Sequence, residues 1–194
     1  VIGTRSDCMD EEKLKYFADI QKTHYVIIEY GIESTYDRTL ERINRGHDFK
    51  NVVDMLHLTK EYGIKTGGHM IFGLPGESRQ EMLDQVYTLN ELPLDNIKFH
   101  QLQIIKGTHM AKEYKTSPKN FNLFEMQEYI DFVVKFLERL NPNFVVERFA
   151  GEVPPRYLVS EGWGKIRYDQ ISNAIEKKLS ADNTWQGRLF ECRV

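Results

Sequence analysis

Short β-branched segments alternate with amphipathic helical segments through the first half of this chain, and that alternation limits its fold more than any other feature. The patterns at 1–5, 25–30, 65–72 and 96–105 are typical of strands, and apolar residues at helical spacing lie between them. Strands that alternate with helices form βα units, whose parallel strands are connected by right-handed crossovers. The sequence therefore predicts an α/β fold with a parallel sheet.

The length of the chain limits how much of a (βα) barrel it can form. An eight-unit barrel usually takes about 250 residues, whereas the four units here end near residue 105 of 194. A long helix, a strand and a last helix are predicted beyond that point, at 123–140, 144–149 and 168–179. We expect a single domain over 1–194, with the βα units of a partial TIM-like barrel in 1–110 and helices and a strand packed on it in 111–194.

Composition excludes several classes of protein. The chain is 41% hydrophobic and 28% charged, as in a globular domain, and it has no run of about 18 apolar residues that would suit a membrane. Its net charge of −3 provides no basic surface for nucleic acid. Cys8 and Cys192 have no partner at metal-ligand spacing, which predicts reduced thiols and a cytoplasmic location. Because it begins with Val1 in a strand pattern, we expect the chain to be a piece of a longer protein.

Polar residues interrupt the predicted strands near their carboxyl ends, where parallel α/β proteins bind ligands. Side chains alternate between the two faces of a strand, so Lys98 and His100 share one face of theirs, and Glu29 and Glu33 share one face of another. A third strand carries His69. Two interpretations are open: these side chains line a polar cavity that binds a ligand, or they form a Glu–Lys or Glu–His network that only fixes the register of the sheet.

Two loops carry weaker signals. Gly-Leu-Pro-Gly-Glu at 73–77 follows a strand and precedes a helix, but it lacks the spacing of a phosphate-binding loop, so an ordinary tight turn is the better interpretation. Asn-Arg-Gly-His at 44–47 lies between two predicted helices. Its glycine suits a left-handed backbone, and its arginine suits a carboxylate or phosphate partner.

Five segments of the chain together resemble a known family. They are Ile-Gly-Thr-Arg-Ser-Asp-Cys at 2–8, Gly-Ile-Glu-Ser at 31–34 with Thr-Leu at 39–40, Ile-Asn-Arg-Gly-His-Asp-Phe at 43–49, His-Met-Ile-Phe-Gly-Leu-Pro-Gly-Glu at 69–77, and Lys-Phe-His-Gln-Leu at 98–102 with Lys-Gly-Thr at 106–108. Their order and spacing resemble the later part of radical S-adenosylmethionine (SAM) proteins, in the broad group of Elongator-type proteins and oxygen-independent coproporphyrinogen oxidases. Within that group the chain is similar to the YhcC-type bacterial Fe-S oxidoreductases. The resemblance runs from residue 1 to about residue 163.

The resemblance implies the C-terminal part of a (βα)6 three-quarter barrel and a [4Fe-4S] cluster held by three closely spaced cysteines. In such enzymes the cluster gives one electron to SAM, and cleavage yields methionine and a deoxyadenosyl radical that abstracts hydrogen from the substrate. The resemblance also implies tRNA or cofactor modification, with flavodoxin or ferredoxin as electron donor. This chain has no cysteine triplet. We therefore expect it to contact SAM, to hold no metal itself and to be inactive alone, with the cluster loop upstream of Val1.

The resemblance assigns three residues to SAM, and a departure from the family pattern adds a fourth. Glu33 matches the polar residue of the family's Gly-x-Gln or Gly-x-Glu pattern, and Arg45 matches the arginine that reaches the carboxylate or ribose of SAM. His69 matches a strand position that contacts the cofactor. The ribose-binding carboxylate of many relatives is replaced here by Gly3, so that contact would need Arg5 or Asp7 to reorganise the site. Arg5 is the fourth candidate.

Lys98 and His100 are the candidate catalytic residues, because their strand would lie beside the open seam of the barrel and face the substrate. A different class of function stays open. His69 and His100, with Glu29 or Glu33, would suit zinc or manganese in a metal-dependent barrel hydrolase or lyase. A non-catalytic RNA-associated module is the third class, and the near-neutral charge gives it no basic groove.

Overall fold

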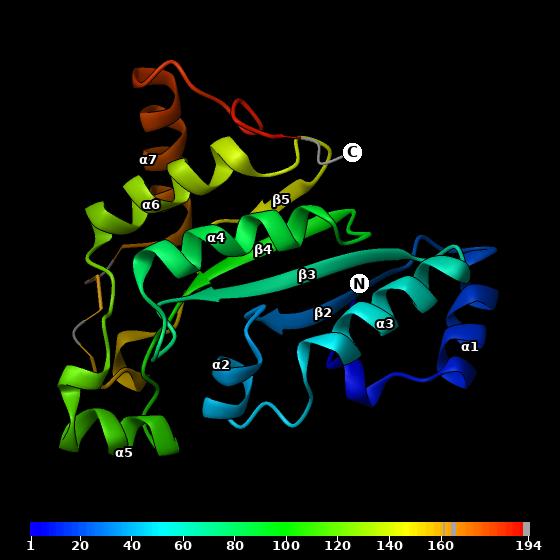
Figure 1. The fold of residues 1–194 in the computed structure, drawn as a ribbon, viewed down its shortest axis with the longest axis horizontal. Coiled ribbons are helices and arrows are strands. Elements are labelled where there is room, and N and C mark those ends of the chain that lie inside the picture. The colour runs from blue at the N-terminus through cyan, green and yellow to red at the C-terminus, as the bar shows by residue number, and fades with distance from the viewer. Residues whose placement is uncertain (161, 164–165, 192–194) are drawn as a thin grey trace.

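The computed structural model describes residues 1–160, 162–163 and 166–191, and a parallel sheet lies at its centre (Figure 1). Its five described strands follow one another in sequence order, each paired in parallel with the next. They are β1 (Ile2–Thr4), β2 (Ile27–Glu33), β3 (Lys65–Phe72), β4 (Asn96–Gln101) and β5 (Val145–Arg148). The predicted parallel α/β sheet is confirmed.

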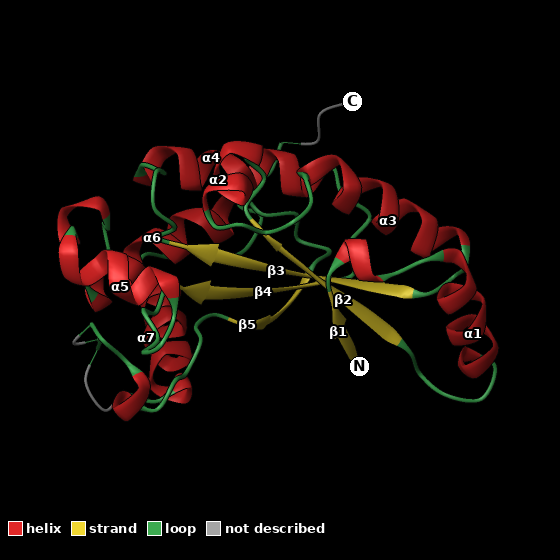
Figure 2. Cartoon of the chain, turned by 90° about the horizontal axis from the view of Figure 1, so that it is seen from below, coloured by secondary structure: helices red, strands yellow, loops and turns green. Residues whose placement is uncertain are grey.

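Helices connect these strands and cover one face of the sheet. They are α1 (Glu11–Gln21), α2 (Asp37–Arg42), α3 (Phe49–Glu61), α4 (Arg79–Asn90), α5 (His109–Thr116), α6 (Met126–Arg139) and α7 (Tyr168–Ala181), with short 3-10 turns at Ser6–Cys8, Pro118–Asn120 and Pro155–Tyr157. Figure 2 shows α3, α4 and α6 along the same side, whereas the opposite face of the central strands is not covered by a helix. None of the described helices is long and apolar enough to cross a membrane.

Strand alternation divides the two faces of the sheet by chemistry. Apolar side chains that point toward the helices are fully buried, among them Tyr30, Phe72 and Phe99. The rings of Phe72 and Phe99 lie 5.0 and 5.3 Å from the ring of Phe136 on α6, a spacing at which aromatic pairs add about 0.5–1.5 kcal/mol beyond their burial. The strand positions between these residues point to the helix-free face, and several of them are charged or polar.

Some element boundaries differ from the predicted ones. The second strand continues past residue 30 to Glu33, through a register shift after Gly31, and Glu33 adopts a left-handed φ of 65°. The fourth strand ends at Gln101 rather than at residue 105, because the chain beyond it bridges to Leu158 instead of to a neighbouring strand. Helix α5 was not predicted, and α6 begins at Met126 rather than at residue 123.

Candidate functional site

A buried carboxylate network crosses four neighbouring strands on the helix-free face of the sheet. Glu29 on β2 pairs through Oε2 with Nε2 of His69 on β3 at 2.9 Å, and its Oε1 accepts a hydrogen bond from Nζ of Lys98 on β4. Nζ of Lys98 also lies 3.0 Å from Oε2 of Glu147 on β5, whose Oε1 accepts a hydrogen bond from Nδ2 of Asn96. The Glu29 side chain is only 5% exposed, so these partners replace water around its charge.

The network sets the charges of its members. Burial raises the pKa of Glu29, but the hydrogen bonds from Lys98 and His69 outweigh burial and hold that pKa below its usual value. Burial also opposes the charge of Lys98, but its bonds to Glu29 and Glu147 outweigh burial and raise the pKa of Lys98. At neutral pH the network therefore contains an ionised carboxylate between the ammonium group of Lys98 and the ring of His69.

A second polar group, Glu33 with Arg45, lies where β2 ends. Oε1 of Glu33 is 3.3 Å from Nη2 of Arg45, and the same Nη2 donates a hydrogen bond of 2.7 Å to the carbonyl oxygen of Gly31. A Cβ at Gly31 would overlap both Arg45 Nη2 and Glu33 Oε1, so only glycine lets the guanidinium cross the strand here. Burial raises the pKa of Glu33, and the charge of Arg45 opposes that rise. The structure thus brings together two residues that the resemblance had assigned to one ligand.

The loop after Glu33 is held by side chains of α4 and of the turn before it. Oγ of Ser34 donates to Oε1 of Glu77 at 2.5 Å, and Oε1 of Gln85 accepts from the backbone N–H of Thr35 at 2.7 Å. Nε2 of Gln85 donates to Oε2 of Glu77 at 3.0 Å. The 73–77 segment is therefore a tight turn that fixes this loop. Sequence reasoning missed Gln85, although a glutamine within the apolar stripe of α4 was a usable signal.

A pocket of about 310 Å³ opens beside both groups, at the carboxyl ends of β3 and β4. Its lining includes Glu33, His69 and His100, and the two imidazole rings lie 5.8 Å apart. Burial, followed by electrostatic interactions with His69, Arg148 and Lys98, lowers the pKa of His100 to about 4. His100 is therefore a neutral imidazole at neutral pH. Three of the sequence-predicted residues consequently face one cavity.

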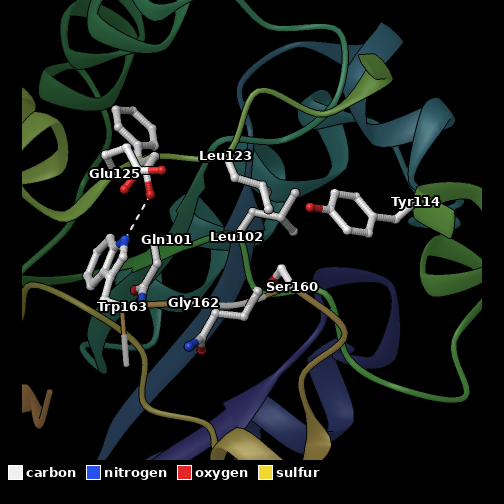
Figure 3. Close-up of a pocket in the computed structure, with 10 residues that line it drawn as sticks. Gln101, Leu102, Tyr114, Leu123, Glu125, Ser160, Gly162 and Trp163 are labelled. Carbon is white, nitrogen blue, oxygen red and sulfur yellow. Dashed lines mark hydrogen bonds between the residues drawn. The ribbon is translucent and has the colours of Figure 1, made fainter. Parts of the chain in front are cut away.

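A larger pocket of about 460 Å³ adjoins the first (Figure 3) and shares three lining residues with it, Gln101, Leu102 and Gln103. Tyr114 and Trp163 lie on opposite sides of this pocket in Figure 3. Trp163 is fixed because its Nε1 donates to the carbonyl oxygen of Phe124 at 2.8 Å. Gln101 exchanges two hydrogen bonds with the backbone of Gly151, at 2.8 and 3.0 Å. The pocket therefore combines aromatic walls with side-chain amides.

Arg5 lies at the margin of the site rather than with Glu33. Its Nε donates to Oδ1 of Asp7 at 2.8 Å, and its side chain is 44% exposed. A Cβ at Gly46 would lie 3.4 Å from Nη2 of Arg5, so the guanidinium approaches the loop that carries Arg45. The structure places Arg5 near the candidate ligand site but pairs it with Asp7.

The two candidate catalytic residues have different surroundings. The ammonium group of Lys98 forms ion pairs with Glu29 and Glu147, and the Lys98 side chain is 16% exposed. His100 lines the smaller pocket. A role that faces the substrate stays a prediction for both residues, and the geometry favours His100.

The residues that the structure describes contain no group of three or more His, Cys, Asp or Glu side chains that could hold a metal ion. Glu29 already uses one oxygen for His69 and the other for Lys98. The metal-dependent hydrolase or lyase alternative is therefore not supported. Cys8 is a free, exposed cysteine, and Cys192 lies outside the described residues.

Comparison with proteins of known sequence identifies several relatives. The uncharacterized protein MJ0486 of Methanocaldococcus jannaschii is 35% identical over 193 residues, which are 97% of this chain and 58% of that protein. Protein YhcC of Escherichia coli K12 is 31% identical over 168 residues, 86% of this chain and 54% of YhcC. A tRNA uridine(34) acetyltransferase of Methanocaldococcus infernus is 25% identical over 162 residues, 81% of this chain and 29% of the relative. The chain thus spans little more than half the length of the first two relatives.

The fold has a match among solved structures. The archaeal Methanocaldococcus infernus Elp3 with an N-terminal deletion superimposes with a TM-score of 0.78 at 21% identity, over 95% of this chain and 42% of Elp3. This match, with the parallel strand order, confirms the predicted partial-barrel fold class. The family model of the Radical SAM superfamily matches residues 1–86, and the model of the Radical SAM C-terminal domain matches residues 94–181. As its motifs predicted, the chain belongs to the radical SAM superfamily.

Proposed function

We propose that this chain forms the SAM-facing wall and part of the substrate pocket of a radical SAM Fe-S oxidoreductase. The Glu33–Arg45 pair carries the proposal, because it places an acceptor and a donor 3.3 Å apart at the carboxyl end of β2. The carboxyl ends of barrel strands are where such folds bind ligands. His69 extends this wall onto the next strand, in the same pocket as Glu33.

SAM fits the chemistry of these residues. It carries a carboxylate, an ammonium group and ribose hydroxyls. Nε of Arg45 is buried and has no hydrogen-bond partner within the described residues, so a donor is available for the carboxylate or a ribose oxygen. A cation or a hydroxyl donor beside Glu33 would offset the burial that raises its pKa. Glu33 would therefore accept from the ammonium group or the ribose, and Arg45 would donate to an oxygen of SAM.

The iron-sulfur cluster does not fit this chain. Its ligation in the family needs three cysteine thiolates, and the sequence contains two cysteines. We infer that the whole protein supplies these ligands from other residues, and that the 194-residue chain alone is inactive. When bound, the cluster and SAM supply one-electron cleavage of SAM and hydrogen abstraction from the substrate. The residues of this chain bind and orient SAM and the substrate, and they exclude water from the site.

The substrate and the electron donor are further parts of the proposal. The pocket between Tyr114 and Trp163 adjoins the SAM-facing pocket, so a group bound there would lie next to the cofactor. The similarity to a tRNA uridine(34) acetyltransferase favours tRNA as the substrate class over a small cofactor precursor. One-electron chemistry also needs a reduced partner, for which a flavodoxin or ferredoxin is suited.

The test uses the whole protein, purified without air and loaded with iron and sulfide. We expect binding of SAM and formation of methionine and deoxyadenosine with a reductant. Arg45→Lys keeps the charge but removes the planar donor set, and the loss of a charged hydrogen bond of about 1.5–3 kcal/mol corresponds to about 10–150-fold weaker SAM binding. Lys50→Ala on the exposed face of α3 is the matched control. A protein that binds neither iron nor SAM would overturn the proposal.

A further inference from the structure

His69 combines a buried carboxylate partner with access to a pocket. Its side chain is 28% exposed and lines the smaller pocket, whereas its partner Glu29 is 5% exposed. A buried ion network of this kind is seldom more stabilising than apolar packing of the same volume, so stability alone is a weak reason for it. The remaining reasons are the register of the sheet and chemistry at the pocket.

The hydrogen bond to Glu29 determines which nitrogen of His69 carries the proton. The carboxylate of Glu29 is ionised, because Lys98 and His69 hold its pKa below the usual value, and it can only accept hydrogen bonds. Nε2 of His69 must therefore donate to Oε2 across the 2.9 Å contact. In the neutral ring this leaves a lone pair on Nδ1, and no hydrogen bond to Nδ1 is formed within the described residues. The result is an oriented imidazole with a free acceptor.

The strands hold this arrangement in fixed register. His69 on β3 is aligned with Gly31 on β2 and with Lys98 on β4. Nζ of Lys98 donates a hydrogen bond to the second oxygen of Glu29, Oε1, and also pairs with Glu147. Glu29, His69, Lys98 and Glu147 each lie on a different strand, so movement of Glu29 would break its contacts with β3 and β4.

His100 is a poorer acceptor in the same pocket. Its pKa of about 4 leaves it weakly basic at neutral pH, since an efficient base has a pKa near the working pH. It is also covered by the chain: a Cβ at Gly151 would lie 2.7 Å from Nδ1 of His100. Its closeness to Gly151 and its low basicity therefore disfavour His100 as the proton acceptor.

We propose that His69 accepts a proton through Nδ1 from an O–H or N–H group of the substrate, and that Glu29 is its positioning residue. The bond from that oxygen or nitrogen to hydrogen breaks, an Nδ1–H bond forms, and the bond electrons stay on the substrate atom. Glu29 stabilises the resulting imidazolium, Lys98 holds the Glu29 carboxylate in place, and the proton then passes to water. The proposal rests on the proposed function only for the identity of the ligand.

The first test is spectroscopic and needs no turnover. In the whole protein labelled with [15N]histidine, His69 should show a slowly exchanging proton on Nε2, and Glu29→Leu, which leaves no acceptor, should abolish that signal. The exposed His57 on α3 is the internal control and should show no such proton. A rapidly exchanging Nε2 proton on His69 in the unaltered protein would overturn the inference.

The second test separates a proton acceptor from a structural or SAM-binding residue. His69→Ala should lower product formation by about 100–10,000-fold, the range for general base catalysis, and added imidazole should restore part of it. Glu29→Gln should lose about 10–100-fold, as expected for a residue that orients another, and imidazole should not rescue it. If His69→Ala folds normally but imidazole restores nothing, the acceptor role is wrong. Failure of SAM binding in the unaltered protein would overturn the proposed function instead and leave the spectroscopic result valid.

Discussion

Replacing Lys98 by methionine should destabilise the fold in a way that depends on pH. The substitution keeps most of the volume of the side chain and removes the ammonium group that lies between Glu29 and Glu147. Glu29 would then keep one partner, His69, while its side chain stays almost fully buried. Glu147 is more exposed and can be solvated by water. The loss in the free energy of unfolding therefore comes mainly from the unpaired, buried charge of Glu29.

The expected magnitude follows from the burial of the pair. Removal of one partner from a buried ion pair costs about 3–5 kcal/mol, and the partial exposure of Lys98 puts this case at about 3 kcal/mol. For a chain of this length, about 1 kcal/mol lowers Tm by roughly 2–4 °C, so Lys98→Met should lower Tm by roughly 6–12 °C.

The pH dependence has a definite sign. In the unaltered protein the pKa of Glu29 is below its usual value, so Glu29 contributes stability above about pH 4.3 and loses it as pH falls through the folded-state pKa. Without Lys98, burial dominates and raises the pKa of Glu29, so the ionised carboxylate destabilises the fold until it is protonated. The difference in stability between the two proteins should therefore be larger at pH 7 than at pH 4.

Urea unfolding followed by circular dichroism at pH 7 and pH 4 measures this difference. Lys50→Met is the control, because Lys50 and its partner Asp54 are both largely exposed and the unfolding midpoint should not change. A loss below about 1 kcal/mol at pH 7, or a loss that is the same at both pH values, would refute the idea that Lys98 holds a buried Glu29 in its charged form.

Three further substitutions test other parts of the structure. Gly31→Ala should displace Arg45, because the new Cβ overlaps its Nη2, and this strain should lower the stability by about 1–3 kcal/mol. Displacement of Arg45 should also weaken the binding of SAM by the whole protein about tenfold or more. Unchanged SAM affinity, measured by calorimetry, would argue against Glu33 and Arg45 as a ligand site. Gln85→Met leaves the N–H of Thr35 without a partner and removes one of the hydrogen bonds to Glu77, so urea unfolding should show a loss of about 1–3 kcal/mol. Full retention of stability would mean that water replaces the amide. Phe136→Ala should cost about 3–5 kcal/mol in the same assay, because its fully buried ring contacts those of Phe72 and Phe99; a small loss would show that the core collapses around the cavity.

The fold followed from the sequence where local pattern and burial agree. Strands β2, β3 and β4 carry β-branched or aromatic residues at alternating positions, and the helices between them carry apolar stripes, so their existence and order were predictable. Helix α5 was missed because it spans only eight residues and has few apolar positions: Ala111 is buried in the structure, and Met110 and Tyr114 are partly buried. The end of β4 depends on the bridge between Ile105 and Leu158, 53 positions later, and local pattern carries no information about such a contact.

The candidate site was predictable in part, for a similar reason. Alternation along the strands placed Glu29 and Lys98 on inward positions, and the structure joins them. The contact of Glu147 with Lys98 could not be predicted, because it depends on how β5 pairs with β4, including a register shift. The pair of Glu33 and Arg45 came from the family resemblance, since a 12-residue separation across a helix does not by itself imply contact.

The two interpretations of the polar strand positions are compatible in this structure. Glu29, Lys98 and Glu147 do satisfy one another and tie β2, β4 and β5 together, as a register-fixing network would. A network built only for register would have no need to end on a partly exposed imidazole. His69 pairs with the buried carboxylate of Glu29 and also lines the pocket that Glu33 lines. The network therefore connects a buried charge to that pocket. The same contacts that hold the strands in register therefore orient the side chain that faces the ligand, so register and function depend on the same residues.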